Sequence, residues 1–202
     1  LVALDLDEAA RVLREARAGG SLEAVSDAVV LPALRRLAED EQRDAWPQAR
    51  AAEVRERFEE LLMEMAEGAE PQEASAAGVR VLIAPALDDN DALAGRWLAR
   101  VCEARGATAL LASPHALVSE VAQVKSEAPD AVCIGALTQR AAMHARLVCK
   151  RLAGADGAEI LVGLWAASPQ TPGAPADARI TTIATAAELV ARLQSRRLRL
   201  RS

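Results

Sequence analysis

Three carboxylates stand together where a predicted strand gives way to a predicted helix. Asp88, Asp89 and Asp91 follow a short apolar run, and a helical pattern begins among them. Carboxylate oxygens of this kind are ligands for Mg²⁺. The same residue type also caps the free amides of a helix N-terminus and interacts favourably with its dipole. We favour capping because it is the simpler role, and we predict no metal site.

The histidines and cysteines indicate no further chemistry. Neither His115 nor His144 has a companion at the spacing of metal ligands. Cys102, Cys133 and Cys149 are odd in number and form no C-x-x-C pair, so we expect reduced cysteines in a cytoplasmic protein. The sequence has no G-x-S-x-G elbow, and no serine or cysteine is flanked by a recognisable base. We predict no catalytic residue.

The elements that position these residues fall into two halves. Residues 1–67 show three or four amphipathic helices, whereas residues 79–202 alternate short apolar runs with helical patterns. Residues 68–78 between them are small and polar, as is typical of a linker. Apolar strands joined by helices predict a parallel sheet covered on both faces. We therefore predict an α/β fold, in which a helical bundle cap precedes a flavodoxin-like, doubly wound sheet of order 2-1-3-4-5.

Residue patterns give the approximate bounds of these elements. The predicted strands are Val79–Ala84, Thr108–Ala112, Ala131–Leu137, Ile160–Leu164 and Ile180–Ile183. The predicted helices of the second half are Asn90–Arg105, Pro114–Ala128, Gln139–Ala153 and Ala186–Ser195. Ser21 is a plausible N-cap in the first half, Pro32 is expected to kink or split the helix that follows it, and Thr185 to Glu188 forms a capping box.

Composition limits the kinds of partner. The chain has 202 residues, 51% of them hydrophobic, and a net charge of −5. An acidic chain offers no global attraction to nucleic acid or anionic lipid. The one basic cluster, Arg196 to Arg201, is expected to be a solvated or frayed end. No apolar run approaches the roughly 20 residues that span a bilayer, and no signal peptide is evident.

Two common functions of such a sheet are excluded, namely dinucleotide binding and the role of a phosphorylated receiver domain. Ligands bind beyond the carboxyl ends of the strands, where the strand order reverses. A dinucleotide needs a glycine-rich first turn, and the turn here is acidic without glycine. A phosphorylated receiver domain needs an aspartate at the end of the third strand and a lysine after the fifth. The third strand here ends in Ala136-Leu137, and Ala184-Thr185 follows the fifth.

Several segments resemble the cobalamin-binding domain family. Where that family has Asp/Glu-x-His-x-x-Gly, this chain reads Asp89-Asn90-Asp91-Ala92-Leu93-Ala94. The family's Ser-x-Leu corresponds to Gly135-Ala136-Leu137, and its Gly-Gly segment corresponds to Gly163-Leu164. Residues 21–34 are similar to the helical cap of the family, and residues 177–189 are similar to its final turn and helix. The resemblance implies a cap over a flavodoxin-like domain.

All three motifs depart from the family at the residues that would hold the cofactor. Asp91 stands in place of the cobalt-ligating histidine, and a hard carboxylate suits cobalt less well than a neutral nitrogen donor. Gly135 lacks the serine hydroxyl that lies near the dimethylbenzimidazole tail, and Leu164 adds bulk in place of a glycine. The resemblance therefore implies a degenerate branch without histidine ligation. Residues 144–152 look like a branch fused to permeases of the autoinducer-exporter type.

Two tryptophans extend the predicted ligand site toward the cap. Trp165 follows the fourth strand, and Trp46 lies at a break in the helical half. Together they would sandwich a planar ligand or seal a ligand-free interface, and the sequence favours neither. Eight residues make up the predicted binding site: Trp46, Asp89, Asp91, His115, Gly135, Leu137, Gly163 and Trp165.

The leading hypothesis is a non-enzymatic, cytoplasmic sensory or regulatory module. It would bind cobalamin or another tetrapyrrole between cap and sheet without a protein histidine ligand. The alternative is a domain without a small ligand, which serves as an interaction or regulatory module of a membrane permease or signalling protein. The sequence leaves the oligomeric state open, with a homo-oligomer among the partners considered. We expect an open cleft, because Gly135 and Gly163 keep two strand ends slim. Filling of the cleft around Leu164 would favour the alternative.

Overall fold

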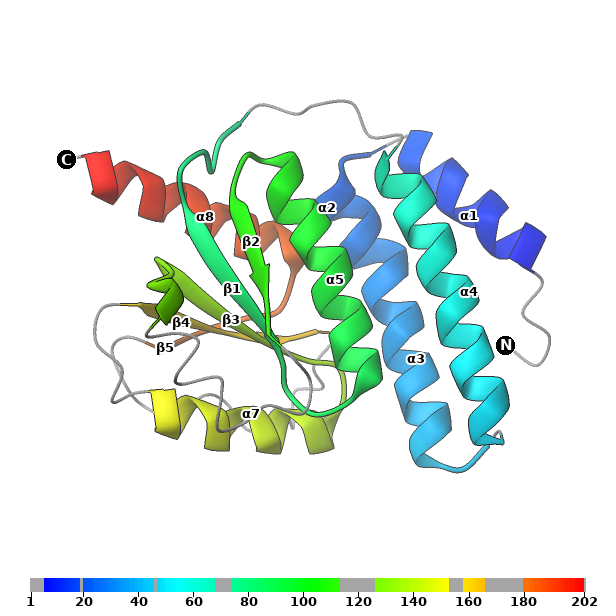
Figure 1. Cartoon of the computed structure of the whole chain (residues 1–202). Coiled ribbons are helices and arrows are strands. Elements are labelled where there is room, and N and C mark those ends of the chain that lie inside the picture. Colours follow the sequence, from blue (N-terminus) through cyan, green and yellow to red (C-terminus); the bar gives the residue numbers. More distant parts are fainter. Residues whose placement is uncertain are drawn as a thin grey trace.

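Five parallel strands form one sheet in the computed structural model, which describes residues 6–18, 20–45, 47–67, 74–112, 126–152, 158–165 and 180–201. The strand order is β2-β1-β3-β4-β5 (Figure 1). The strands are β1 (Arg80–Pro85), β2 (Thr108–Leu111), β3 (Ala131–Ala136), β4 (Glu159–Leu164) and β5 (Ile180–Ile183). The predicted flavodoxin-like, doubly wound order 2-1-3-4-5 is confirmed.

Helices cover both faces of the sheet (Figure 1). Three helices after β1 have bounds within the described residues: α5 (Asp89–Ala104), α7 (Gln139–Leu152) and α8 (Ala186–Arg201). Alternate side chains of the strands enter two different hydrophobic clusters. Val81 and Cys133 pack with α5 and α8, whereas Leu82 and Val132 pack with α7. This alternation is why the strands are apolar at nearly every position.

The first half of the chain forms a helical cap against α5 (Figure 1). Its helical elements are α1 (Leu6–Ala18), α2 (Leu22–Val25), the π-helical turn η1 (Ser26–Val30), α3 (Leu31–Gln42) and α4 (Gln48–Glu67). Leu34 and Leu62 of the cap belong to the same buried cluster as Leu93 and Trp97 of α5. The shared core shows how the cap is attached; the division into separate domains stays a prediction.

The π-helical turn explains how Pro32 is accommodated. Ser21 caps α2 by accepting a hydrogen bond from the Ala24 amide at 3.3 Å, as predicted. The chain then continues from α2 through η1 into α3, where the Leu31 amide donates to the carbonyl of Ser26. Proline has no amide hydrogen, and its ring would clash with the carbonyl one turn back in a regular helix. The wider turn directly before Pro32 relieves this conflict without ending the helix.

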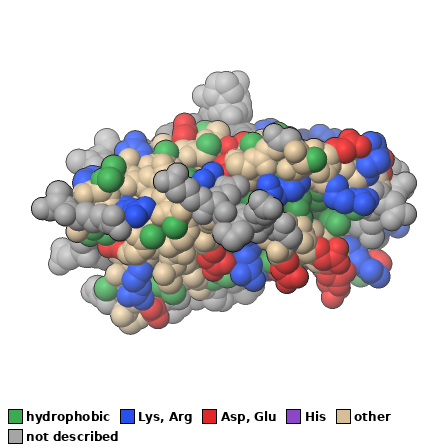
Figure 2. All heavy atoms as spheres, turned by 90° about the horizontal axis from the view of Figure 1, so that it is seen from above, with side chains coloured by type: hydrophobic (Ala, Val, Ile, Leu, Met, Phe, Trp, Pro, Cys, Tyr) green, Lys and Arg blue, Asp and Glu red, His purple; other side chains and the backbone are tan. Residues whose placement is uncertain are grey.

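The basic C-terminal segment is helical and its end is exposed, so of the two expected states the frayed one is wrong and the solvated one is confirmed. Helix α8 continues past the predicted end at Ser195 to Arg201. Arg197 donates to the carbonyl of Ala74, and Arg199 pairs with Glu159 at 3.0 Å. These partners lie far away in the sequence, so the local pattern could not reveal them. On the face seen in Figure 2, basic side chains lie among acidic and apolar ones.

Parts of the predicted architecture lie outside the described residues. These parts are most of the predicted helix Pro114–Ala128, residues 166–178 between the fourth and fifth predicted strands, and residues 68–73 of the linker. The end of the linker is described and is anchored. Ala76 is buried and its amide donates to the Arg105 carbonyl at 2.9 Å, and Gln194 donates to the Ser75 hydroxyl at 2.6 Å.

We expect Ser26 to be a structural link between cap and sheet. Its buried hydroxyl accepts a hydrogen bond from the Trp97 indole at 2.7 Å and donates to the Leu22 carbonyl at 2.6 Å. Ser26→Ala leaves the indole N–H buried without an acceptor, which should lower the free energy of unfolding by about 1–3 kcal/mol. Urea unfolding followed by circular dichroism measures this. In a double-mutant cycle with Trp97→Phe, the double variant should lose less free energy of unfolding than the sum of the losses of the two single variants. Strictly additive losses would contradict the link.

Candidate ligand edge of the sheet

The carboxyl ends of β1, β3 and β4 meet at one edge, where the predicted site residues gather. Pro85 pairs with Gly135, and Gly135 pairs with Gly163, so three strand ends lie side by side. Helix α5 begins at this edge. Asp88 is its N-cap and accepts hydrogen bonds from the Asn90 and Asp91 amides at 3.1 Å each. The predicted capping role is confirmed for Asp88.

Asp91 joins two strand ends from inside the protein. Its side chain is 1% exposed. One carboxylate oxygen accepts from the Leu87 amide at 3.0 Å, and the other accepts from the Leu137 amide at 2.9 Å. The carboxylate therefore ties the turn after β1 to the turn after β3. Burial, with a smaller contribution from the Asp88 charge, raises the pKa of Asp91 to about 7 against the effect of the two N–H donors.

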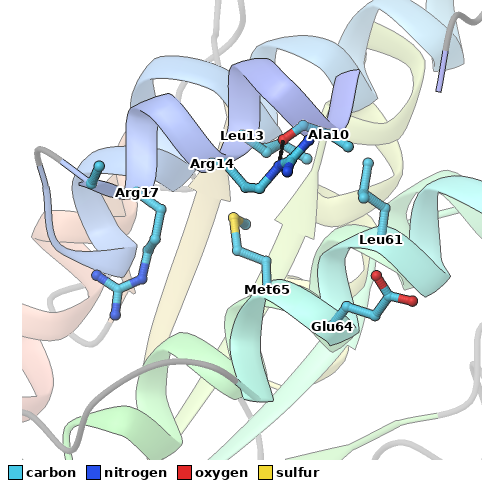
Figure 3. Close-up of a pocket in the computed structure, with 8 residues that line it drawn as sticks. Ala10, Leu13, Arg14, Arg17, Leu61, Glu64 and Met65 are labelled. Carbon is cyan, nitrogen blue, oxygen red and sulfur yellow. Dashed lines mark hydrogen bonds between the residues drawn. The ribbon is translucent and has the colours of Figure 1, made fainter. Parts of the chain in front are cut away.

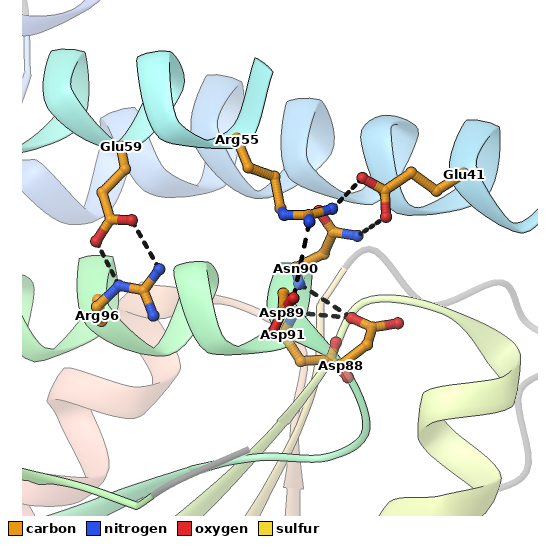
Figure 4. Close-up of polar contacts among 8 residues, drawn as sticks. All are labelled: Glu41, Arg55, Glu59, Asp88, Asp89, Asn90, Asp91 and Arg96. Atoms are coloured by element: carbon orange, nitrogen blue, oxygen red, sulfur yellow. Dashed lines mark hydrogen bonds and ion pairs between the residues drawn. The ribbon is translucent and has the colours of Figure 1, made fainter. Parts of the chain in front are cut away.

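A polar cluster holds the cap over the start of α5 (Figure 4). Asn90 donates to the Glu41 carboxylate at 2.8 Å, and Arg55 pairs with Glu41 and lies 3.7 Å from Asp89. Farther along α5, Arg96 and Glu59 form a bidentate ion pair. Asp89 thus faces a cap arginine at the surface and is partnered by protein.

Trp165 occupies the space beside the two glycines. Its side chain is 1% exposed. A Cβ atom on Gly163 would lie 2.1 Å from the indole Cζ2, and one on Gly135 would lie 2.8 Å from the indole Nε1. The expectation that these glycines keep a cleft open is therefore wrong. Glycine is needed at both positions because the indole ring packs directly on the backbone. Leu164 is also buried, at 5% exposure.

The structure brings together five of the eight predicted site residues. Asp91, Gly135, Leu137, Gly163 and Trp165 meet at the edge through contacts with one another. Asp89 lies at its rim. Trp46 and His115 lie outside the described residues, so their predicted places are not described.

Sequence reasoning missed the partners that close this edge. Gln42 at the end of α3 donates to the Thr138 hydroxyl at 2.9 Å, across 96 positions of the chain. His144 of α7 has its Nδ1 beside the Ala86 carbonyl, so this histidine supports the turn after β1. No local pattern identifies such pairs. The only local signal is that Thr138 also accepts from the Ala141 amide at 3.2 Å, as a helix-capping residue does.

The described residues show no other chemical centre at this edge. Among them, no three His, Cys, Asp or Glu side chains are grouped so as to hold a metal ion. No helix in the described ranges is both long and apolar enough to cross a membrane. The fold and the edge together define a class: a flavodoxin-like α/β protein with a helical cap and a polar, largely buried junction between them.

Comparison with known proteins gives a distant likeness among solved structures. No protein-family model matches the sequence, and no curated protein matches it. Among solved structures, the chain is similar to one described as a novel cobalamin-binding protein from Desulfitobacterium hafniense DCB-2. The two are 15% identical, the match covers 96% of this chain and 93% of that chain, and the TM-score is 0.47. At this distance, the ligand and activity of this chain have to be argued from its own residues.

Titration of Asp91 should make stability depend on pH. Its folded-state pKa of about 7 lies above the ordinary aspartate value of 3.8, so the folded protein binds more protons than the unfolded chain between these pH values. The free energy of unfolding should therefore fall as pH rises from about 4 to about 7. Asp91→Asn removes the contribution of Asp91 to this slope. It also costs about 1–3 kcal/mol at about pH 5, because the new amide group cannot accept from both N–H donors. Urea unfolding at about pH 5 and about pH 8 measures both effects.

Asp130→Asn is the matched control for that prediction. The Asp130 carboxylate accepts from the Arg80 amide at 2.8 Å, but this bond lies at the surface. The control should keep the slope of the wild-type protein. Asp27 contributes a slope of the same sign in every variant, because burial raises its pKa as well. Glu23 contributes the opposite sign, because against the effect of burial its hydrogen bonds to Arg105 and Ser21 lower its pKa. An unchanged slope in Asp91→Asn would contradict the assignment.

The contact between Gly163 and Trp165 predicts a strong size effect. Gly163→Ala forces the indole to move, and we expect a loss of about 1–3 kcal/mol or more in the free energy of unfolding. The same substitution in a Trp165→Leu background should cost much less, because the smaller side chain leaves room for the methyl group. Thermal and urea unfolding of the four proteins give the comparison. Equal losses in the two backgrounds would show that Trp165 does not fill this space.

Proposed function

We propose that this chain is a non-catalytic regulatory or protein-interaction module whose own side chains occupy the ligand edge of its sheet. One observation carries the proposal: the buried indole of Trp165 lies against Gly135 and Gly163, where the strand ends are slim enough to admit a ligand. In doubly wound sheets this edge is the usual binding place. Here a ligand at the same position has to displace the indole.

The ionisable groups of the edge support a non-catalytic role. Both oxygens of Asp91 accept backbone hydrogen bonds, and Asp88 caps α5. A general acid or base has to reach its substrate, and these groups are engaged with protein.

The cysteines support the same conclusion. Burial raises the pKa of the Cys133 thiol to about 12 and that of the Cys149 thiol to about 11, and Cys102 is shifted in the same direction. Nucleophilic cysteines need the opposite shift, because the thiolate is the reactive form. No cysteine of this chain is therefore proposed as a nucleophile.

A sensor of a flat ligand such as cobalamin or another tetrapyrrole is the second candidate. The observation that favours it is the indole Nε1 of Trp165, which is buried and has no hydrogen-bond partner among the described residues. A buried donor without an acceptor costs about 1–3 kcal/mol, so the closed edge is held less firmly than a fully satisfied core. In this candidate the ligand replaces the indole, and no protein histidine coordinates its metal.

Titration with hydroxocobalamin distinguishes the two candidates. For the interaction module, tryptophan emission of the wild-type protein should show no saturable quenching, and equilibrium dialysis should show no retained corrinoid. Trp165→Ala should lower the free energy of unfolding by about 3–5 kcal/mol, the usual loss for truncating a buried aromatic side chain. Saturable binding by the wild-type protein would overturn the first candidate and support the sensor. Trp97→Phe changes a tryptophan away from the edge. It serves as the control that shows whether any quenching comes from Trp97 instead.

A further inference from the structure

We propose that the groove between α1 and α4 binds a single-chain amphiphile that carries one carboxylate, such as a medium-chain fatty acid. The groove has a volume of about 520 Å³, and all of its lining residues that the structure describes belong to these two cap helices (Figure 3). That volume lies within the range of small-molecule sites. The groove is separate from the sheet edge, so the proposal does not depend on whether the edge binds a ligand.

The floor of the groove is apolar and belongs to the protein core. Leu13 of α1 is buried, and Leu61 and Met65 of α4 pack against the main hydrophobic cluster. Figure 3 shows Met65 between the two helices. An unbranched thioether adapts its shape to a flexible alkyl chain. This floor suits the hydrocarbon part of the ligand.

Arg17 supplies an unsatisfied donor at one end of the groove. Its Nη1 donates to the Gly20 carbonyl at 2.9 Å, so the side chain is held in place. Its Nε is buried and has no acceptor among the described residues. A buried charged donor without an acceptor is costly, and a carboxylate oxygen would satisfy it with a strong, charge-assisted bond. Arg14, one turn earlier on α1, adds a second positive charge to the lining.

Glu64 determines the direction in which a ligand with one charged end lies in the groove. In Figure 3, Arg17 and Glu64 lie on opposite sides of Met65. A single anionic head is attracted toward Arg17 and repelled from Glu64. A second carboxylate at the far end of the ligand would meet Glu64, so dicarboxylates are disfavoured. The groove therefore favours a monocarboxylate whose chain runs from Arg17 across Met65.

Methyl NMR with decanoate as the probe tests the proposal. The chain has only three methionines, Met63, Met65 and Met143. With ¹³C-methyl methionine in the full chain, decanoate should shift the Met65 signal saturably. The Met143 signal should stay unchanged, since that residue lies on α7 with 53% exposure. Decanol, which lacks the carboxylate, should bind at least about tenfold more weakly.

Three variants separate recognition of the head from occupation of the groove. Arg17→Gln should weaken decanoate binding at least about tenfold and leave decanol binding unchanged. Arg11→Gln is the matched control, because Arg11 on the same helix pairs with Glu8 and Glu15. Leu61→Trp should fill the groove and abolish binding of both probes. Absence of a Met65 shift in the wild-type protein, or equal affinity for decanoate and decanol, would overturn the proposal.

Discussion

The packing of one indole ring on two neighbouring glycines determines what the ligand edge of this sheet can hold. Gly135 and Gly163 are paired across β3 and β4, and Trp165 follows β4 directly. The ring lies so close to both that a single methyl group at position 163 has no room. Ligand binding at this edge is therefore a competition between the ligand and a side chain that is already in place. The cost of expelling a buried aromatic ring sets the affinity that a ligand must supply.

The cap closes the same edge from the other side. Glu41, Gln42 and Arg55 reach across the junction to Asn90, Thr138 and Asp89. Below them, Asp91 joins the turns after β1 and β3. Networks of this kind are stable when each member has a partner. Two buried groups at this junction, the Asn90 side-chain oxygen and the Trp165 indole nitrogen, lack a hydrogen-bond partner among the described residues, so the network is not fully satisfied.

The sequence predicts the fold well because the fold depends on local patterns. Apolar runs place each end of the five strands to within one residue, since parallel strands are buried on both faces. The caps at Ser21 and Asp88 follow from hydrogen bonds between near neighbours. The candidate site is harder to predict from the sequence, because the space at the sheet edge depends on the orientation of one side chain. The sequence places Trp165 at the edge, but only the structure shows that its ring fills the space beside Gly135 and Gly163.

The solvent exposure of the Trp165 indole tests the closed edge most directly. Its ¹H–¹⁵N indole resonance can be assigned by its loss in Trp165→Phe and then followed while a hydrophilic nitroxide is added. The account predicts a resonance that the nitroxide does not broaden, because the side chain is 1% exposed. Broadening comparable to that of free tryptophan would place the ring in solvent and contradict the closed edge.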